Sequence, residues 1–154
     1  MKHDNRFKIE WGLSILQKYG SLILEEQLKE YQLTKTQMMF MIHLLNRDGI
    51  HQEELARSFK LDRATATRGI KHLEKIGYVT RQVDPQNKRA NLLFLTEEGK
   101  GLRMVVGKAV FTWLDIITDD MSEEEVAMSI KIIGKMAANA CSHLGDDHLA
   151  EKFR

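Results

Sequence analysis

The chain has one cysteine, one proline and ten glycines among its 154 residues, and each shortage excludes a class of structure. A single cysteine cannot form a disulfide within the chain, which suits a reducing compartment. So little glycine and proline argues against long flexible linkers. No apolar stretch reaches the ~18 residues that a transmembrane helix needs, and the N-terminus lacks the apolar core of a signal peptide. We therefore expect a cytoplasmic protein with no membrane partner.

Sequence motifs of catalysis are also missing. The chain has no G-x-S-x-G, no glycine-rich phosphate loop, no HExxH and no Cys/His pair in a plausible frame. Its acidic clusters at 53–54 and 123–125 are typical of solvated helix surfaces rather than of a convergent carboxylate pair. We expect no enzymatic activity, no cofactor and no metal.

Charge is unevenly distributed, although the net charge of the chain is only +1. Between Arg57 and Arg89, nine basic residues stand against three acidic ones, so this segment carries +6 and the rest of the chain −5. Basic patches of this kind attract polyanions such as nucleic acid. A solvated basic surface without a partner is the alternative that charge alone leaves open.

Hydrophobic periodicity and capping residues predict a mainly helical chain. Apolar residues at helical spacing predict a first helix over 6–30. Thr34 and Gln37 form a capping box for a second helix that ends near Arg47. Further helices are predicted over 52–58 and 63–76, as one long helix from Thr96 to about residue 118, and in a last helix with a capping box at Ser122. In the last helix we expect the apolar stripe to be buried; its members are Val126, Ile130, Ile133, Ala137 and Ala140.

A β-hairpin is predicted directly after the fourth helix. Gly77 is the expected stop of that helix, and strands follow over 78–83 and 91–95. Between them, Asp84 and Pro85 suit the first two positions of a turn. Two helices joined by a three-residue turn and followed by a hairpin form a winged helix-turn-helix. The fold class is therefore mainly α (α+β).

The fourth helix has one apolar face and one basic, polar face. The major groove of B-DNA, roughly 12 Å wide, admits one such helix. The hairpin can lay an arginine into the neighbouring minor groove, where narrow A-tracts concentrate negative potential. The residues on the outward face of the helix are Arg63, Thr65, Thr67, Arg68 and Lys71, and those of the hairpin arm are Lys88 and Arg89. Double-stranded DNA is the partner that this pattern indicates.

The segment from Leu55 to Gly99 reads LARSFKLDRATATRGIKHLEKIGYVTRQVDPQNKRANLLFLTEEG. It resembles the core of the multiple-antibiotic-resistance regulator (MarR) family of transcription factors, and the order of the flanking helices is similar as well. The resemblance implies a homodimer with interleaved terminal helices, a palindromic operator, usually repression, and often release by a small ligand.

The resemblance also assigns roles to single residues. Arg89 corresponds to a wing arginine in the minor groove, with Lys88 beside it on the DNA backbone. Thr65, Thr67 and Arg68 correspond to residues that face the major groove, while Arg81 and Asp84 brace the wing or touch phosphate. The chain departs from the family at two positions: Asn87 stands where many members have Asp, and His51 stands where Ser or Thr usually caps the third helix.

The terminal helices carry more apolar surface than the winged unit can cover. Exposed apolar patches of that size are rare on monomers. We therefore expect an N-terminal dimerisation helix (1–33), a DNA-binding unit (34–99), C-terminal dimerisation helices (100–146) and a polar tail (147–154). The alternative is that these stripes pack on their own chain.

Several further functions stay open at this stage. A pocket for a small aromatic or phenolic effector is predicted between the dimer helices and the winged unit, lined by Trp11, Tyr19, Tyr31, Met38, Met41, His43 and Trp113. The alternatives are a winged helix that binds only protein, or a metal- or redox-responsive regulator. For the last, the candidate groups are His143, His148 and Cys141.

Overall fold

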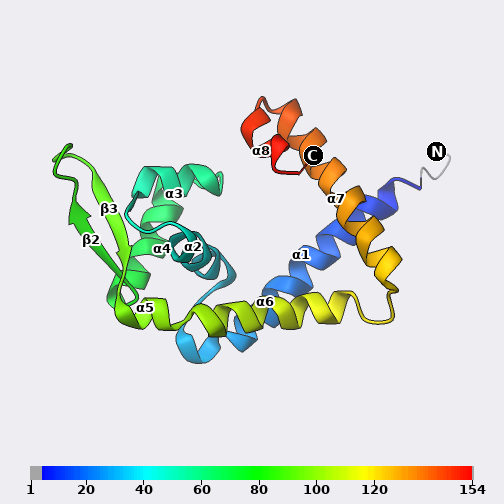
Figure 1. Cartoon of the computed structure of the whole chain (residues 1–154), viewed down its shortest axis with the longest axis horizontal. Coiled ribbons are helices and arrows are strands. Elements are labelled where there is room, and N and C mark those ends of the chain that lie inside the picture. Colours follow the sequence, from blue (N-terminus) through cyan, green and yellow to red (C-terminus); the bar gives the residue numbers. More distant parts are fainter. Residues whose placement is uncertain (1–4, 154) are drawn as a thin grey trace. The chain divides into compact units, whose positions relative to one another are not determined.

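The computed structural model describes residues 5–153, most of them in helices (Figure 1). The chain begins with α1 (Phe7–Gln27), a 3-10 turn η1 (Lys29–Tyr31) and α2 (Lys35–Asn46). The first helix is three residues shorter at its C-terminal end than the sequence predicted. Leu28 turns the chain into η1, and Gln32 adopts a left-handed backbone with φ of 55°. The capping box before α2 is confirmed, because Gln37 donates its backbone N–H to Thr34 Oγ1 and accepts from the Thr34 N–H.

The middle of the chain is a winged helix-turn-helix. It contains β1 (Ile50–His51), α3 (Gln52–Ser58), α4 (Arg63–Lys75), β2 (Val79–Val83) and β3 (Asn91–Leu95). The sheet is antiparallel in the order β1-β3-β2, with Ile50 opposite Leu93 and Val79 opposite Leu95. The hairpin and both helices were predicted. Strand β1 was not, and it places His51 in the sheet as well as at the start of α3, where its side chain makes no capping hydrogen bond.

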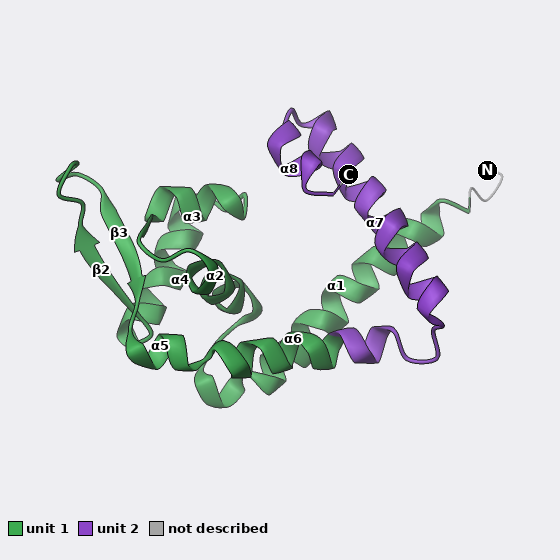
Figure 2. Cartoon of the chain, in the orientation of Figure 1, with its two compact units in different colours: residues 1–113 green, residues 114–154 purple. Residues whose placement is uncertain are grey.

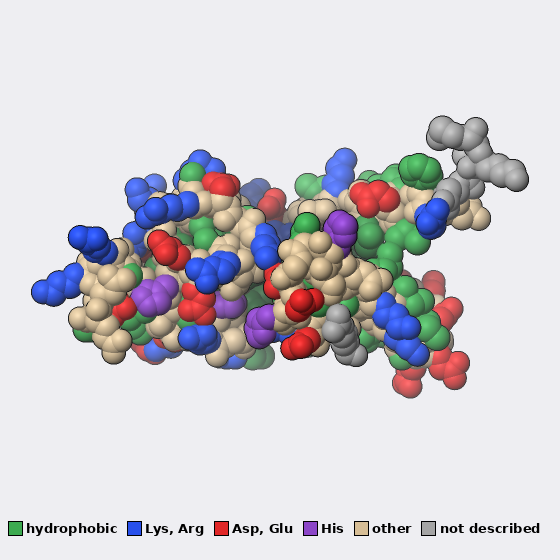
Figure 3. Space-filling view, turned by 90° about the horizontal axis from the view of Figure 1, so that it is seen from above, with side chains coloured by type: hydrophobic (Ala, Val, Ile, Leu, Met, Phe, Trp, Pro, Cys, Tyr) green, Lys and Arg blue, Asp and Glu red, His purple; other side chains and the backbone are tan. Residues whose placement is uncertain are grey.

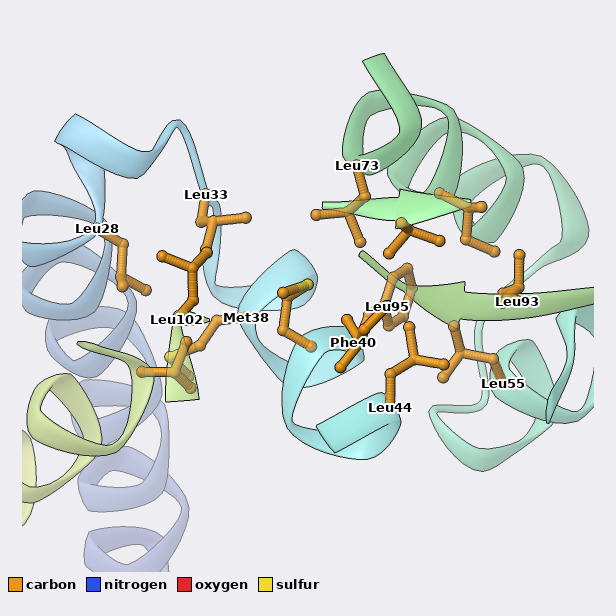
Figure 4. Close-up of a cluster of buried hydrophobic side chains, with 14 of the residues drawn as sticks. Leu28, Leu33, Met38, Phe40, Leu44, Leu55, Leu73, Leu93, Leu95 and Leu102 are labelled. Carbon is orange, nitrogen blue, oxygen red and sulfur yellow. The ribbon is translucent and has the colours of Figure 1, made fainter. Parts of the chain in front are cut away.

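A continuous hydrophobic core joins the winged unit to α1, α2 and α6. Phe40 of α2 is fully buried, and its ring centroid lies 5.4 Å from that of Phe59 after α3. Figure 4 shows Leu44, Leu55 and Leu93 around it. In the same view, Leu28, Leu33 and Leu102 form a second group where α1 meets α2. Burial of this kind is worth about 1.5–3 kcal/mol for each large side chain, so the core fixes the positions of α3 and α4.

The long helix predicted from Thr96 is wrong in one respect: it is two helices, α5 (Glu97–Gly101) and α6 (Arg103–Ile117). Leu102 between them donates its N–H to the Gly99 carbonyl in a 3-10 turn. Two glycines within three residues weaken the helix here. Gly99 is buried against the start of the wing, and a Cβ at this position would overlap the Tyr78 carbonyl oxygen. Only glycine therefore lets α5 pack this closely on the backbone before β2.

The chain divides into two compact units, Met1–Trp113 and Leu114–Arg154, and the division falls within α6 (Figure 2). The second unit contains α7 (Glu123–His143) and a short helix α8 (Asp147–Glu151). The predicted capping box is confirmed, since Glu125 donates its N–H to Ser122 Oγ and accepts from the Ser122 N–H.

The predicted polar tail (147–154) contains the short helix α8 as far as the chain is described. Asp146 caps α8 by accepting from the Leu149 N–H at 3.3 Å, and Ala150 is fully buried where α8 packs on α7. The chain reverses at Gly145, whose φ of 73° suits glycine. The mostly polar composition of this segment gave no indication of a capped helix that packs on α7.

Large apolar side chains remain on the surface of α1, α6 and α7. The burial predicted for the stripe of α7 is wrong for this chain alone, because Ile130 is 70% exposed and Ile133 is 52% exposed. Val126 and Ala137 are half-buried, and Ala140 is exposed. On α1, Trp11 is 72% exposed. Among the described helices, none is long and apolar enough to cross a membrane.

Candidate nucleic-acid interface

Helix α4 is held on the core by one face and is open on the other. Ala66, Ile70 and Leu73 are fully buried, as the periodicity predicted. Asp62 caps the helix by accepting from the Thr65 N–H at 2.9 Å. Hydrogen bonds from the Thr65 side chain and backbone lower the pKa of Asp62 below its ordinary value of 3.8, so the cap is a carboxylate at neutral pH.

The open face of α4 carries the side chains predicted to meet DNA. Arg63, Arg68 and Lys71 are exposed, and Arg68 donates to Thr65 Oγ1 at 3.0 Å. Thr67 is half-buried beside α3, and its Oγ1 accepts a hydrogen bond at 2.9 Å from Gln52 Nε2 on that helix. The structure thus confirms the orientation of this face and adds Gln52, which no sequence pattern had singled out.

The wing is tied to α4 by an ion pair. Arg81 of β2 donates from Nη2 to Glu74 Oε2 at 2.7 Å, and both side chains are less than a third exposed. Arg81 Nε is buried and has no hydrogen-bond partner among the described residues. Because Arg81 already pairs with α4, its position fits a brace for the wing better than a free DNA contact.

The turn of the wing is organised by two short polar side chains. Asp84 is 9% exposed; its Oδ1 accepts from the Gln86 N–H at 2.8 Å, and its Oδ2 lies 3.4 Å from His51 Nε2. Asn87 Oδ1 accepts from the Arg89 N–H at 3.2 Å. The asparagine that replaces the family's usual aspartate therefore still holds the backbone of the wing arginine.

Lys88 and Arg89 are exposed at the wing, and Figure 3 shows Lys and Arg side chains gathered at that end of the unit. Arg89 also faces a cavity of about 320 Å³ between α3, α4 and the wing. Arg63 of α4 and Arg81 of β2 line the same cavity, with Gln52 and Thr67 at the helix-turn-helix side. Three arginines thus line one cavity beside the open face of α4, together with Glu53. Because Arg81 is paired with Glu74, the positive charge available to phosphate here comes from the exposed Arg63 and Arg89.

Within one chain, the residues predicted to line an effector pocket lie in different surroundings. Met38 and Met41 lie inside the core at 1% and 0% exposure, whereas Tyr19 is 52% exposed on α1. Tyr31 and Trp113 are half-buried against the core, and the Trp113 ring packs on Gly20. The His43 ring lies edge-on to Phe59, with centroids 5.7 Å apart. A different apolar cavity, of about 250 Å³, lies between α2 and α6; Ile42, Leu45, Val106, Val110 and Phe111 are among its lining residues.

The candidate sensor groups lie in the second unit. Cys141 is half-buried in α7, and His143 and His148 are exposed. Within residues 5–153, no three His, Cys, Asp or Glu side chains come together as a metal site.

Comparison with known proteins agrees with this geometry. The MarR family model matches residues 33–90, which include the helix-turn-helix and most of the wing. A MarR transcriptional regulator from Methanosarcina mazei is 30% identical in sequence, with a TM-score of 0.83 over 90% of this chain and 92% of that one. The chain belongs to the MarR family.

Two further proteins are similar to this chain, one in sequence and one in fold. The uncharacterized HTH-type transcriptional regulator YybA of Bacillus subtilis is 42% identical over 74 residues, which are 48% of this chain and about half (49%) of YybA. The MepR structure of Staphylococcus aureus, solved in a complex with DNA, shares the fold at 20% identity, with a TM-score of 0.77 over 84% of this chain and 96% of MepR. As a MarR-family member, the chain is a DNA-binding transcriptional regulator and not an enzyme.

Proposed function

We propose that this MarR-family regulator is a homodimeric repressor that binds a palindromic operator. The observation that carries the proposal is that the exposed Arg63 of α4 and Arg89 of the wing line one cavity beside the open face of α4. A helix that fits the major groove and a wing that reaches the adjacent minor groove would then follow the same turn of DNA. A cytoplasmic location is part of the proposal, because the DNA partner must be within reach.

Each exposed side chain of this surface has a distinct role in the proposal. Arg68, with Thr65 and Thr67, faces base edges in the major groove, while Arg63 and Lys71 lie along its phosphates. Lys88 contacts the backbone, and Arg89 enters the minor groove. Arg81 acts through the wing, because its guanidinium is held by Glu74 at 2.7 Å.

The dimer follows from the apolar surfaces outside the winged unit. We assign residues 1–33 and 100–146 to dimerisation and residues 34–99 to DNA binding. Trp11 on α1 and Ile130 on α7 are 72% and 70% exposed, and a second copy of the chain is the partner that would cover such stripes. Two copies of α4 related by a twofold axis would contact half-sites about one helical turn, ~34 Å, apart.

Titration with the intergenic DNA beside its own gene tests the proposal. Binding should be sequence-selective and should weaken by about 10³–10⁵ between 50 and 200 mM salt if ~6–10 phosphates are contacted. Inserting about five base pairs between the half-sites turns them to opposite sides of the duplex and should abolish tight binding. Binding that ignores both sequence and spacing would contradict the proposal.

We also propose a small aromatic or phenolic effector, and we assign it to the apolar cavity between α2 and α6. Its walls are largely apolar, and Arg103 lies at its edge with Nη2 bound to the Leu45 carbonyl at 2.7 Å. A panel of such compounds, titrated into the protein–DNA complex, should release DNA for at least one member. Gly107 also lines the cavity, and a side chain added there would meet no other group, so Gly107→Trp should occupy the cavity and remove that response while operator binding persists.

A further inference from the structure

Gln52 makes a hydrogen bond that links the two helices of the helix-turn-helix. It is the first residue of α3, and its Nε2 donates to Thr67 Oγ1 on α4 at 2.9 Å. The two residues are 15 positions apart, and both side chains are half-buried. Both also line the cavity beside Arg63, so the bond lies at the edge of the DNA-facing surface.

This bond fixes the conformation of Thr67. A threonine in a helix divides between two χ1 rotamers, because its hydroxyl can bond a carbonyl three or four residues earlier. The Gln52 amide holds Oγ1 on the side of α3 instead. Since hydroxyl and methyl share the same Cβ, holding one also places the other. The orientation of the Thr67 hydroxyl and methyl groups is therefore fixed before DNA binds.

Thr65 provides an internal comparison on the same helix. Its Oγ1 also accepts a hydrogen bond, but the donor is Arg68 Nη2, an exposed side chain one turn away. That bond therefore depends on the position of an exposed, flexible side chain that is itself proposed to contact DNA. Gln52 belongs to another helix and can keep its bond to Thr67 when DNA binds.

We infer that Gln52 is a positioning residue that sharpens base discrimination through Thr67 at one base pair of each half-site. This inference rests on the proposed function, because it needs Thr67 to face the major groove. Gln52 carries no charge, so its contribution should not change with salt. Its effect should appear as selectivity at one position rather than as affinity for DNA in general.

The test begins with binding sites selected by the wild-type protein from random duplexes. Affinities are then measured for the selected site and for its single-base variants, with wild type and with Gln52→Met, which keeps the chain length and removes the amide. Discrimination should fall about three- to tenfold at the position read by Thr67, as expected for one lost hydrogen bond. Other positions, the salt slope and binding to random DNA should not change.

Two substitutions of Thr67 separate positioning from a direct contact. Thr67→Val keeps the shape and removes the hydroxyl, so adding Gln52→Met to it should cause no further loss at that position. Thr67→Ser keeps the hydroxyl, so it should remain sensitive to Gln52→Met. The comparison remains valid even if Gln52→Met lowers the melting temperature, because that loss of stability would be the same in the Thr67→Val and Thr67→Ser proteins.

Three results would overturn the inference. Additive losses in the Gln52→Met/Thr67→Val protein would show that the two side chains act separately. An equal loss on every sequence would make Gln52 a backbone contact, and an unchanged selectivity profile would deny it any role. If the wild-type protein selected no preferred sequence from the random duplexes, the proposed sequence-specific DNA binding would itself be wrong. That result would be known before any Gln52 variant is compared.

Discussion

Helices α4 and α7 carry apolar stripes of similar spacing, yet only the stripe of α4 is covered. Ile70 and Leu73 of α4 are completely buried, whereas Ile130 and Ile133 of α7 are 70% and 52% exposed. An amphipathic pattern therefore indicates that a face will be buried but not which molecule buries it. The winged unit completes its core within one chain, whereas we expect a second chain to cover the exposed stripes of α1 and α7.

The largest effect is expected from a substitution that prevents a second copy of the chain from covering the stripe of α7. Ile130→Glu places a charge in the stripe of α7 and should convert the proposed dimer to a monomer at micromolar concentration, because burying an unpaired charge is very unfavourable. Multi-angle light scattering measures the mass directly. Lys131→Glu, an exposed change on the next residue, should leave the dimer intact. A wild-type monomer, or an Ile130→Glu dimer, would contradict the assignment of α7.

The next largest effect is expected in the buried core of the winged unit. Phe40→Ala empties a fully buried site beside Phe59 and should lower the free energy of unfolding by about 3–5 kcal/mol. Thermal and denaturant unfolding followed by circular dichroism give the value. Met39→Ala, on the exposed neighbour in α2, should have a far smaller effect. Similar losses at the two positions would show that the core is not where the structure places it.

A smaller effect is expected at the wing, where the exposed groups are polar. Arg89→Ala should weaken operator binding about 10- to 100-fold and reduce the salt slope by about one. Lys88→Ala should reduce the slope similarly but affect all sequences alike. Fluorescence anisotropy at several salt concentrations measures both. Lys108→Ala, an exposed change on α6, serves as the control, and an Arg89→Ala protein with wild-type affinity would exclude the minor-groove role.

The smallest effect concerns the cap of α4 and depends on pH. The pKa of Asp62 is lowered in the folded protein, first by the side-chain hydrogen bond from Thr65. Its contribution to stability is therefore present above 3.8, the ordinary value, and is lost as the pH falls through the lower folded value. Asp62→Asn keeps a capping oxygen without this titration, so its melting temperature should decline less over the acid range. If the melting temperatures of wild type and Asp62→Asn fell equally with decreasing pH, this contribution of Asp62 would be excluded.

Local signals in the sequence were enough to predict most of the elements. The capping boxes at Thr34 and Ser122 involve partners three residues away, and both are present. The burial of Ala66, Ile70 and Leu73 likewise follows from the spacing within one helix. These features depend on neighbours along the chain, which a single sequence displays.

Features that depend on distant partners could not be predicted in the same way. Strand β1 has only two residues and exists because Ile50 pairs with Leu93, more than forty residues later. Gln52 reaches Thr67 across a turn between two helices, and no pattern distinguishes it from any other helix-surface glutamine. The basic face of α4 was visible in the sequence, but the hydrogen bond from α3 to Thr67 and the ion pair between Glu74 and the wing appear only in the folded chain.

The close contact at Gly99 has a mechanical consequence. Because the backbone of α5 lies against the Tyr78 carbonyl, and Thr96 Oγ1 donates to the Gly77 carbonyl at 2.6 Å, the base of the wing cannot shift without α5. We therefore expect α5 and the hairpin to move as one body, so that a displacement of α5 would also displace Lys88 and Arg89 on the wing.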